Sequence, residues 1–442
     1  MEYTYFVNLS SGFFITFIVV TLIGSILTEV LSWLNSDKRN VKNKISHLKI
    51  FSKISEKYFN IGKLKKSLAY KRERDNFNNF KSNISSGIET LLLIFGIVPL
   101  LITTISYVFP TLSMTYCFIV ASLITSVVRT LFSIPFNYYE NFSIEQRYGF
   151  NTLTKKLFIK DNIVGMSLGL VLGVPFLLFT NWAISQIADL SFTSICCMIV
   201  GIIAVIKIVQ MLFVNVIMPL FNKFEPLSDD ILKTKIQKLC KKCGYDISSI
   251  EVMDGSKRSK HSNAFICSTF GKKKLVLFDT LLKDLSHDEI VAVVAHEIGH
   301  SKLHHLSYGL ISGIISFAFV MIISILLMKI PEFYTAFGYS WVNSTNITDN
   351  YLIGFTLASM FIGAFSWIFE PISSWISRKN EYAADKYAAS VVGPKHLSNA
   401  LIKITSKNMS DLFPHPIYEF VNYSHPSIVN RLKALNSYKK IN

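Results

Sequence analysis

Seven long apolar runs, separated by polar stretches, organise this chain of 442 residues. Each run is long enough to cross a hydrocarbon core of ~30 Å as an α-helix. The fifth run is longer than a bilayer requires, so we expect it to leave the membrane as a continuous helix. The predicted spans are residues 11–34, 87–109, 112–136, 161–182, 192–222, 306–328 and 351–375.

The longest stretch between two spans has a different pattern. Leu227–Cys243 has the period of an amphipathic helix. Three short segments that follow are enriched in β-branched and aromatic residues, which predicts strands at Ile250–Met253, Asn263–Cys267 and Leu275–Phe278. We therefore expect a predominantly α, seven-helix polytopic membrane protein with an extramembrane domain that contains a small β-sheet. Its expected regions are residues 1–222 with five spans, 223–305 with the sheet, 306–375 with two more spans, and 376–442, which resume the extramembrane domain.

Composition supports a membrane protein, because half of the residues are hydrophobic and 35 are Phe. The net charge of +16 is concentrated in particular loops. Between Asn35 and Ser86 there are 14 Lys and Arg against four Asp and Glu, whereas residues 330–350 contain no Lys or Arg. By the positive-inside rule, the N-terminus is expected to be lumenal, and residues 223–305 and the C-terminal tail cytosolic. Because the basic loops alternate with spans, nucleic-acid binding is the weaker interpretation of the charge, and no nucleic-acid partner is expected.

Two compositional features outside the spans suggest no chemistry. The Asn-rich stretch Asn76–Asn83 is expected to be a solvated loop. Cys240 and Cys243 form a single C-x-x-C pair without the second pair that a structural zinc site needs, so two reduced thiols on one helix are favoured.

The strongest chemical signal is H-E-I-G-H at residues 296–300. Two His four residues apart lie on one face of a helix and can bind one metal ion, and the Glu after the first His can then serve as general base. The motif stands in an apolar helical pattern that Ser286 and Glu289 open as a capping box. A rigid helix is what such a site requires, so we interpret His296 and His300 as metal ligands and Glu297 as the base.

A catalytic zinc needs a third protein ligand. His304 is ~12 Å from His296 along the helix axis, too far to share one ion, and we expect His304 and His305 to face the cytosol where the sixth span begins. Glu381 and Asp385 are a better pair, since they share a helical face beside small residues. Glu381 can bind the metal, and Asp385 can accept the free N–H of a zinc-bound His. Arg378, one turn earlier, could pair with either carboxylate.

Together these motifs closely resemble the type I CAAX prenyl proteases, integral-membrane gluzincin zinc peptidases that process prenylated proteins. H-E-I-G-H and S-R-K-N-E-Y-A-A-D at 377–385 carry the resemblance. F-S-I-E-Q-R-Y-G-F-N at 142–151 is similar to a cytosolic segment of that family, S-N-A at 262–264 to its substrate-binding edge strand, and His425-Pro426 followed by Arg431 to its C-terminal element. The likeness covers nearly the whole chain.

The resemblance implies one Zn²⁺ per chain, bound by His296, His300 and Glu381, with Glu297 as general base. It further implies that Asn263 and Ala264 position the substrate, that Arg431 also serves substrate binding, that His425 stabilises the tetrahedral intermediate, and that Asp385 orients a ligand. His261, beside the substrate strand, is expected to be structural or solvated. The implied activity is removal of the C-terminal aaX tripeptide from prenylated CAAX-type proteins at the lipid bilayer.

Two alternatives remain open at this stage. An HtpX-like membrane quality-control protease has the same two zinc motifs, but lacks the long N-terminal membrane half. A transporter or channel with vestigial zinc motifs would explain Glu29, Arg129 and Lys207, which lie in or beside predicted spans.

The chain ends in Lys439-Lys440-Ile441-Asn442, a K-K-x-x sequence that acts as an endoplasmic-reticulum retrieval signal when the tail is cytosolic. The same topology places acceptor sequons for glycosylation at Asn343 and Asn346 in the lumen. We therefore expect a multi-pass protein of the endoplasmic-reticulum membrane.

Overall fold

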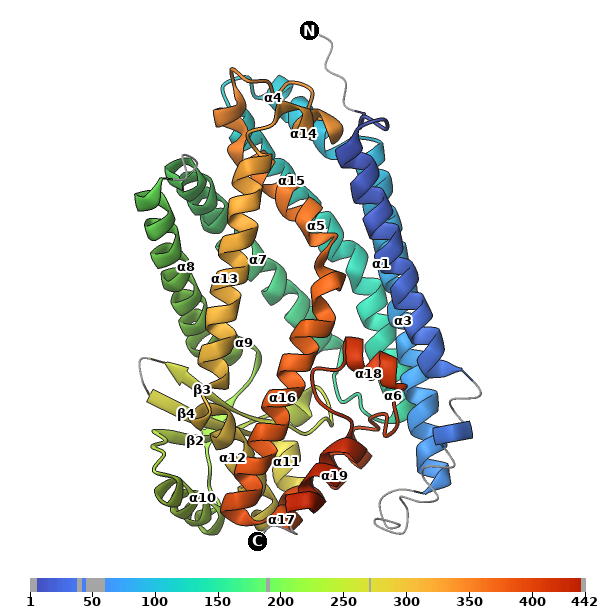
Figure 1. The fold of residues 1–442 in the computed structure, drawn as a ribbon, viewed down its shortest axis with the longest axis vertical. Coiled ribbons are helices and arrows are strands. Elements are labelled where there is room, and N and C mark those ends of the chain that lie inside the picture. Colours follow the sequence, from blue (N-terminus) through green and yellow to red (C-terminus); the bar gives the residue numbers. More distant parts are fainter. Residues whose placement is uncertain (1–5, 38–41, 45–59, 188–190, 270–271, 439–442) are drawn as a thin grey trace.

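The computed structural model describes residues 6–37, 42–44, 60–187, 191–269 and 272–438. Long helices stand side by side through most of its length, and the sheet lies at one end together with several of the shorter helices (Figure 1). The expected architecture, mostly helical with a small sheet, is confirmed. The expected tail signal at residues 439–442 lies outside the described residues.

Within the described ranges, five helices are long and apolar enough to cross a membrane, or up to seven if each of two bent helix pairs forms one span. The bent pairs are α3 (Ile61–Ile94) with α4 (Ile97–Val108), at 53°, and α15 (Tyr351–Gly363) with α16 (Ser366–Val392), at 64°. The five other helices are α1 (Gly12–Ser36), α5 (Met114–Tyr139), α7 (Lys155–Ile187), α8 (Phe192–Leu212) and α13 (His305–Leu327).

The bends in the second and seventh spans were not expected from the apolar pattern. At the first bend, Gly96 has a φ of 58°, a left-handed conformation that glycine adopts at little cost. The fifth span continues from α8 through a π-helical turn (Phe213–Ile217) into α9 (Met218–Phe221), as expected for a helix that leaves the membrane.

The prediction of a loop at Asn76–Asn83 was wrong. These residues are helical, because α3 begins at Ile61, well before the apolar run. The Asn60 side chain caps the helix by accepting from Lys63 N. Asn83 Nδ2 donates to Glu29 Oε1 of α1 over 2.8 Å, so a polar residue stabilises helix packing there. Composition alone does not reveal such a partner.

The sheet has four strands in the order β1-β2-β4-β3. β2 (Ser249–Met253) is parallel to β4 (Lys272–Phe278), and the other pairs are antiparallel. The three predicted strands are confirmed, with β3 (Ala264–Thr269) at one edge. The unpredicted β1 (Phe224–Pro226) is too short for a sequence pattern. The predicted amphipathic helix is α10 (Asp230–Cys243), which Asp229 caps.

The extramembrane core lies between the sheet and the helices that follow it. α12 (His287–Lys302) packs against α10, α16 and α17 (Pro394–Lys407). Ile236, Leu277 and Ile298 are fully buried in this core. α16 extends from the bundle into it, so one helix joins the last apolar span to the extramembrane domain. The chain then ends in α18 (Pro416–Asn422) and α19 (Ile428–Tyr438).

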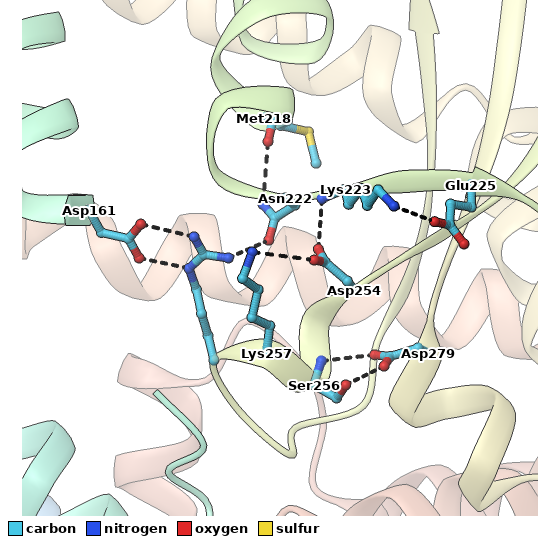
Figure 2. Close-up of polar contacts among 10 residues, drawn as sticks. Asp161, Met218, Asn222, Lys223, Glu225, Asp254, Ser256, Lys257 and Asp279 are labelled. Carbon is cyan, nitrogen blue, oxygen red and sulfur yellow. Dashed lines mark hydrogen bonds and ion pairs between the residues drawn. The ribbon is translucent and has the colours of Figure 1, made fainter. Parts of the chain in front are cut away.

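An ion pair fastens the helix bundle to the loop between β2 and β3. Asp161 of α7 accepts two hydrogen bonds from Arg258, at 2.8 and 2.9 Å, and Asn222 accepts a third from the same guanidinium (Figure 2). The backbone adds to this contact, because Lys260 N donates to Phe150 O and Ser259 forms a bridge with Asn151. The strand that follows is therefore positioned partly by the membrane half.

Candidate metal centre

The helix of the H-E-x-x-H motif begins as the sequence predicts. Ser286 N donates to Glu289 Oε2 over 2.7 Å, and the Ser286 side chain completes the capping box. Lys403 Nζ of α17 also binds Glu289 Oε2, at 2.6 Å. The capping carboxylate thus anchors α12 to a neighbouring helix as well as starting it.

His296, His300 and Glu381 converge, with their ligand atoms within 4.8 Å of one another. The two Nε2 atoms are 3.1 Å apart, His296 Nε2 is 3.6 Å from Glu381 Oε2, and His300 Nε2 is 3.3 Å from Glu381 Oε1. Ligands ~2.0–2.1 Å from one tetrahedral ion lie roughly 3.3 Å apart, so these spacings fit a shared cation. Glu381 Oε2 is also buried without a hydrogen-bond partner among the described residues, which a cation would satisfy.

A polar chain behind the cluster fixes the first histidine. His296 Nδ1 lies 3.0 Å from Asp385 Oδ1, and its Nε2 faces His300 and Glu381. Asp385 is fully buried and accepts two hydrogen bonds from Arg431, at 2.8 and 2.7 Å. Arg431 Nη1 is in addition 3.3 Å from Glu381 Oε2, so one guanidinium contacts both carboxylates.

The assignment of Arg378 needs correction. Arg378 does not pair with either carboxylate; its guanidinium donates to the carbonyls of Glu419 and Tyr423, because α16 turns this side chain toward α18. The expected substrate contact of Arg431 stays a prediction. Only 11% of its side chain is exposed, and its guanidinium bonds both oxygens of Asp385 and lies 3.3 Å from Glu381 Oε2.

The second histidine has a partner that the sequence interpretation missed. His300 Nδ1 lies 2.9 Å from His305 Nδ1, close enough for one ring to donate to the other. This contact depends on the turn between α12 and α13, where His304 has a φ of 56°. His305 was expected only to face the cytosol. Its contact across a left-handed turn is not evident from a helical projection of the sequence.

Close packing of α12 on α16 brings the ligands together. A Cβ on Gly299 would lie 3.2 Å from the Ala384 carbonyl oxygen and 3.1 Å from the Tyr387 ring. Ala384 and Ala388 are fully buried on the facing helix. Small residues were expected to allow this approach, and the structure shows them at the contact.

The cluster opens into a cavity of about 940 Å³. Glu297, Asn263, Ala264 and His425 all line it, as do the three candidate ligands. His425 Nδ1 is 3.0 Å from Glu381 Oε1, and about two-thirds of this side chain is exposed. Burial raises the pKa of Glu297 above its usual range, and the adjacent His296 and His300 oppose that change.

His261 belongs to a second polar cluster at the cavity wall. It stacks on Phe150 with ring centroids 4.3 Å apart, and its Nε2 is 3.6 Å from Glu145 Oε2. Tyr70 of α3 donates to Glu145 Oε1 over 2.5 Å. Glu145 ends a π-helical turn (Glu140–Glu145), so the motif at 142–151 connects the bundle to His261, two residues before Asn263.

Comparison with known proteins agrees with this geometry. Residues 226–439 match the model of peptidase family M48, and residues 40–223 match the model described as CAAX prenyl protease N-terminal, five membrane helices. CAAX prenyl protease 1 of Saccharomyces cerevisiae is 36% identical over 336 residues, which cover 74% of this chain and 73% of the relative. The chain belongs to the CAAX prenyl protease family.

Other members of the family align over more of the chain. The CAAX prenyl protease 1 homolog of Arabidopsis thaliana is 32% identical over 86% of this chain and 88% of its own length. The crystal structure of Ste24p from S. mikatae superposes with a TM-score of 0.81 at 30% identity, covering 96% of this chain and 99% of that chain. The protein is therefore a multi-pass membrane metalloprotease.

Proposed function

We propose that this chain is a zinc-dependent membrane endopeptidase that removes the C-terminal aaX tripeptide from prenylated CAAX-type proteins. The convergence of His296, His300 and Glu381 beside Glu297, at the wall of one cavity, carries the proposal. The names of the relatives supply the substrate class. Prenylated proteins and the lipid bilayer are the expected partners.

One Zn²⁺ per chain would be held by His296, His300 and Glu381, whose nitrogen and carboxylate donors suit that ion. A zinc ion held there supplies Lewis-acid chemistry, polarising the scissile carbonyl and acidifying the attacking water. Asp385 keeps the His296 ring in the tautomer that binds through Nε2, and Arg431 compensates the charge of Asp385.

Glu297 carries out the proton transfers in this mechanism. It takes a proton from the attacking water and passes it to the leaving amine. His425 borders the same cavity and is assigned to stabilising the tetrahedral intermediate.

Substrate binding is assigned to the free edge of β3. Its first residue is Ala264, and its other edge is occupied by β4. An extended peptide can add to the free edge through backbone hydrogen bonds. The Asn263 side chain is exposed in the cavity, where it can hold the register of that peptide.

The decisive experiment is cleavage of a farnesylated CAAX peptide by the purified protein, with the unprenylated peptide alongside.

Glu297→Gln should abolish hydrolysis while zinc content and folding remain, because only the proton acceptor is lost. Glu381→Ala should lose both activity and zinc, since a ligand is removed. Near-normal turnover by Glu297→Gln would contradict the mechanism, and full zinc occupancy in Glu381→Ala would contradict the ligand set.

The alternatives are less well supported. Two of the charges that favoured a transporter meet partners on neighbouring helices: Glu29 bonds Asn83, and Arg129 lies 3.2 Å from Glu89. The match of residues 40–223 to the N-terminal membrane region of CAAX prenyl proteases disfavours a quality-control protease of the HtpX type. One tightly bound zinc per chain, measured by metal analysis, would argue further against a transporter.

The proposal places the protein in the endoplasmic-reticulum membrane, with the N-terminus lumenal and the C-terminus cytosolic. The asymmetry of Lys and Arg between loops supports this orientation. Protease protection in sealed microsomes tests it. A C-terminal tag should be digested by external protease, and a protected tag would place the tail in the lumen.

A further inference from the structure

The cavity of about 940 Å³ continues well past the candidate metal ligands. At its far wall lie Tyr70, Lys71 and Arg74 of α3. Of strand β3, only its first residue, Ala264, lines the cavity, together with the preceding residues 261–263. The cavity is therefore lined both by the N-terminal end of the edge strand and by α3.

This placement fixes which part of a substrate the space can take. A peptide that pairs antiparallel with β3 runs past Ala264, Asn263 and His261 in its own N-to-C direction. The part beyond the scissile bond then enters the cavity, and the prenylated body of the protein stays on the other side. Three extended residues span ~10 Å, and the candidate ligands and the α3 residues line one and the same cavity, which would receive the free C-terminal carboxylate.

The charges at that wall differ in how fully they are compensated. Lys71 Nζ is 3.0 Å from Asp75. Arg74 meets its nearest carboxylate among the described residues, Glu140, only at 3.8 Å, and 45% of its side chain is exposed. Glu145, the other nearby acid, is already bonded to Tyr70.

We propose that Arg74 binds the free C-terminal carboxylate of the substrate, with Lys71, on the same face of α3, adding positive charge. A guanidinium offers two parallel donors that match a carboxylate. The inference rests on the proposed function and deepens it. It gives the enzyme a way to recognise a chain end, at the distance of a tripeptide from the scissile bond.

The test uses two prenylated peptides that differ only in ending as a free carboxylate or as a carboxamide. The wild-type protein should have a kcat/KM about 10- to 100-fold higher for the carboxylate, as expected for a hydrogen bond to a charged group. Arg74→Gln should bring the ratio of the two kcat/KM values close to one, mainly through KM, and Arg74→Lys should restore part of it. Because it is a ratio, partial loss of folded protein does not change it.

Two control variants distinguish carboxylate binding by Arg74 from a general change of charge near the cavity. Arg72 is exposed on the same helix and does not line the cavity, so Arg72→Gln should keep the wild-type ratio. Glu140→Gln should also keep it, since only the weak partner of Arg74 is lost. A wild-type ratio near one, or a ratio unchanged in Arg74→Gln, overturns the inference. Failure of the wild-type protein to cleave either peptide overturns the proposed function instead.

Discussion

Replacement of Arg431 by Met should test how the buried charges of the metal centre are balanced. The guanidinium bonds both oxygens of Asp385, which is fully buried, and lies 3.3 Å from Glu381. Met keeps most of the side-chain volume but leaves two carboxylates without their common cation. Loss of one partner from a buried pair costs about 3–5 kcal/mol, so the free energy of unfolding should fall by that order.

The effect should depend on metal, because a bound cation also compensates Glu381. We expect the loss in Arg431→Met to be larger after chelation than in zinc-loaded protein. Thermal unfolding of the detergent-solubilised protein, with and without chelator, measures this difference. A second substitution, Asp385→Asn, removes the uncompensated charge and should recover a large part of the stability in chelated protein.

Arg147 provides a matched control, since it pairs with Glu73 at the surface and 56% of its side chain is exposed. Arg147→Met should cost less than about 1 kcal/mol. If Arg431→Met and Arg147→Met lowered the unfolding midpoint equally in chelated protein, the charge-balance argument would be refuted. The same conclusion would follow if Asp385→Asn gave no recovery.

Three further predictions concern contacts described above, and a fourth concerns the two glycosylation sequons. His305→Ala should weaken zinc binding about 10- to 100-fold, measured by competition with a chelator, because the partner of a ligand is lost. Gly299→Ala should separate α12 from α16 by a few tenths of an ångström and lower both zinc affinity and kcat. Unchanged values would show that the two helices can accommodate a methyl group at this contact. Asp161→Asn should raise KM without loss of zinc, and Arg258→Gln should add little to it in a double-mutant cycle. Asn343, which is exposed, should carry a glycan more readily than the half-buried Asn346, as a mobility shift after glycosidase treatment would reveal.

Much of the fold was predictable because apolar runs and period-two strands are local signals. The positions of α5, α7, α8 and α13 follow directly from the apolar pattern. The polar half of α3 does not, since its helix depends on long-range contacts such as that of Asn83 with Glu29. The bend at Gly96 also escaped prediction, because a single glycine inside an apolar run is compatible with a straight helix.

The candidate metal ligands were predictable for a similar reason. His296 and His300 are related by helical spacing, and the pairing of His296 with Asp385 follows from chemistry once two helices are assumed to meet. The contacts of Arg378 and Arg431 were not predictable. Each depends on which direction a long side chain takes between packed elements, and α18 and α19 had no sequence signal that placed them beside α16.

The separation of the ligands along the chain has a consequence for biosynthesis. His296 and His300 precede α13, whereas Glu381 follows α15, so two apolar spans are synthesised between them. At ~5–20 residues per second, a ribosome needs about 4–16 s to pass from His300 to Glu381. During that interval the nascent protein would lack one of its three candidate ligands. The metal centre could therefore be completed only after the last two spans have been made.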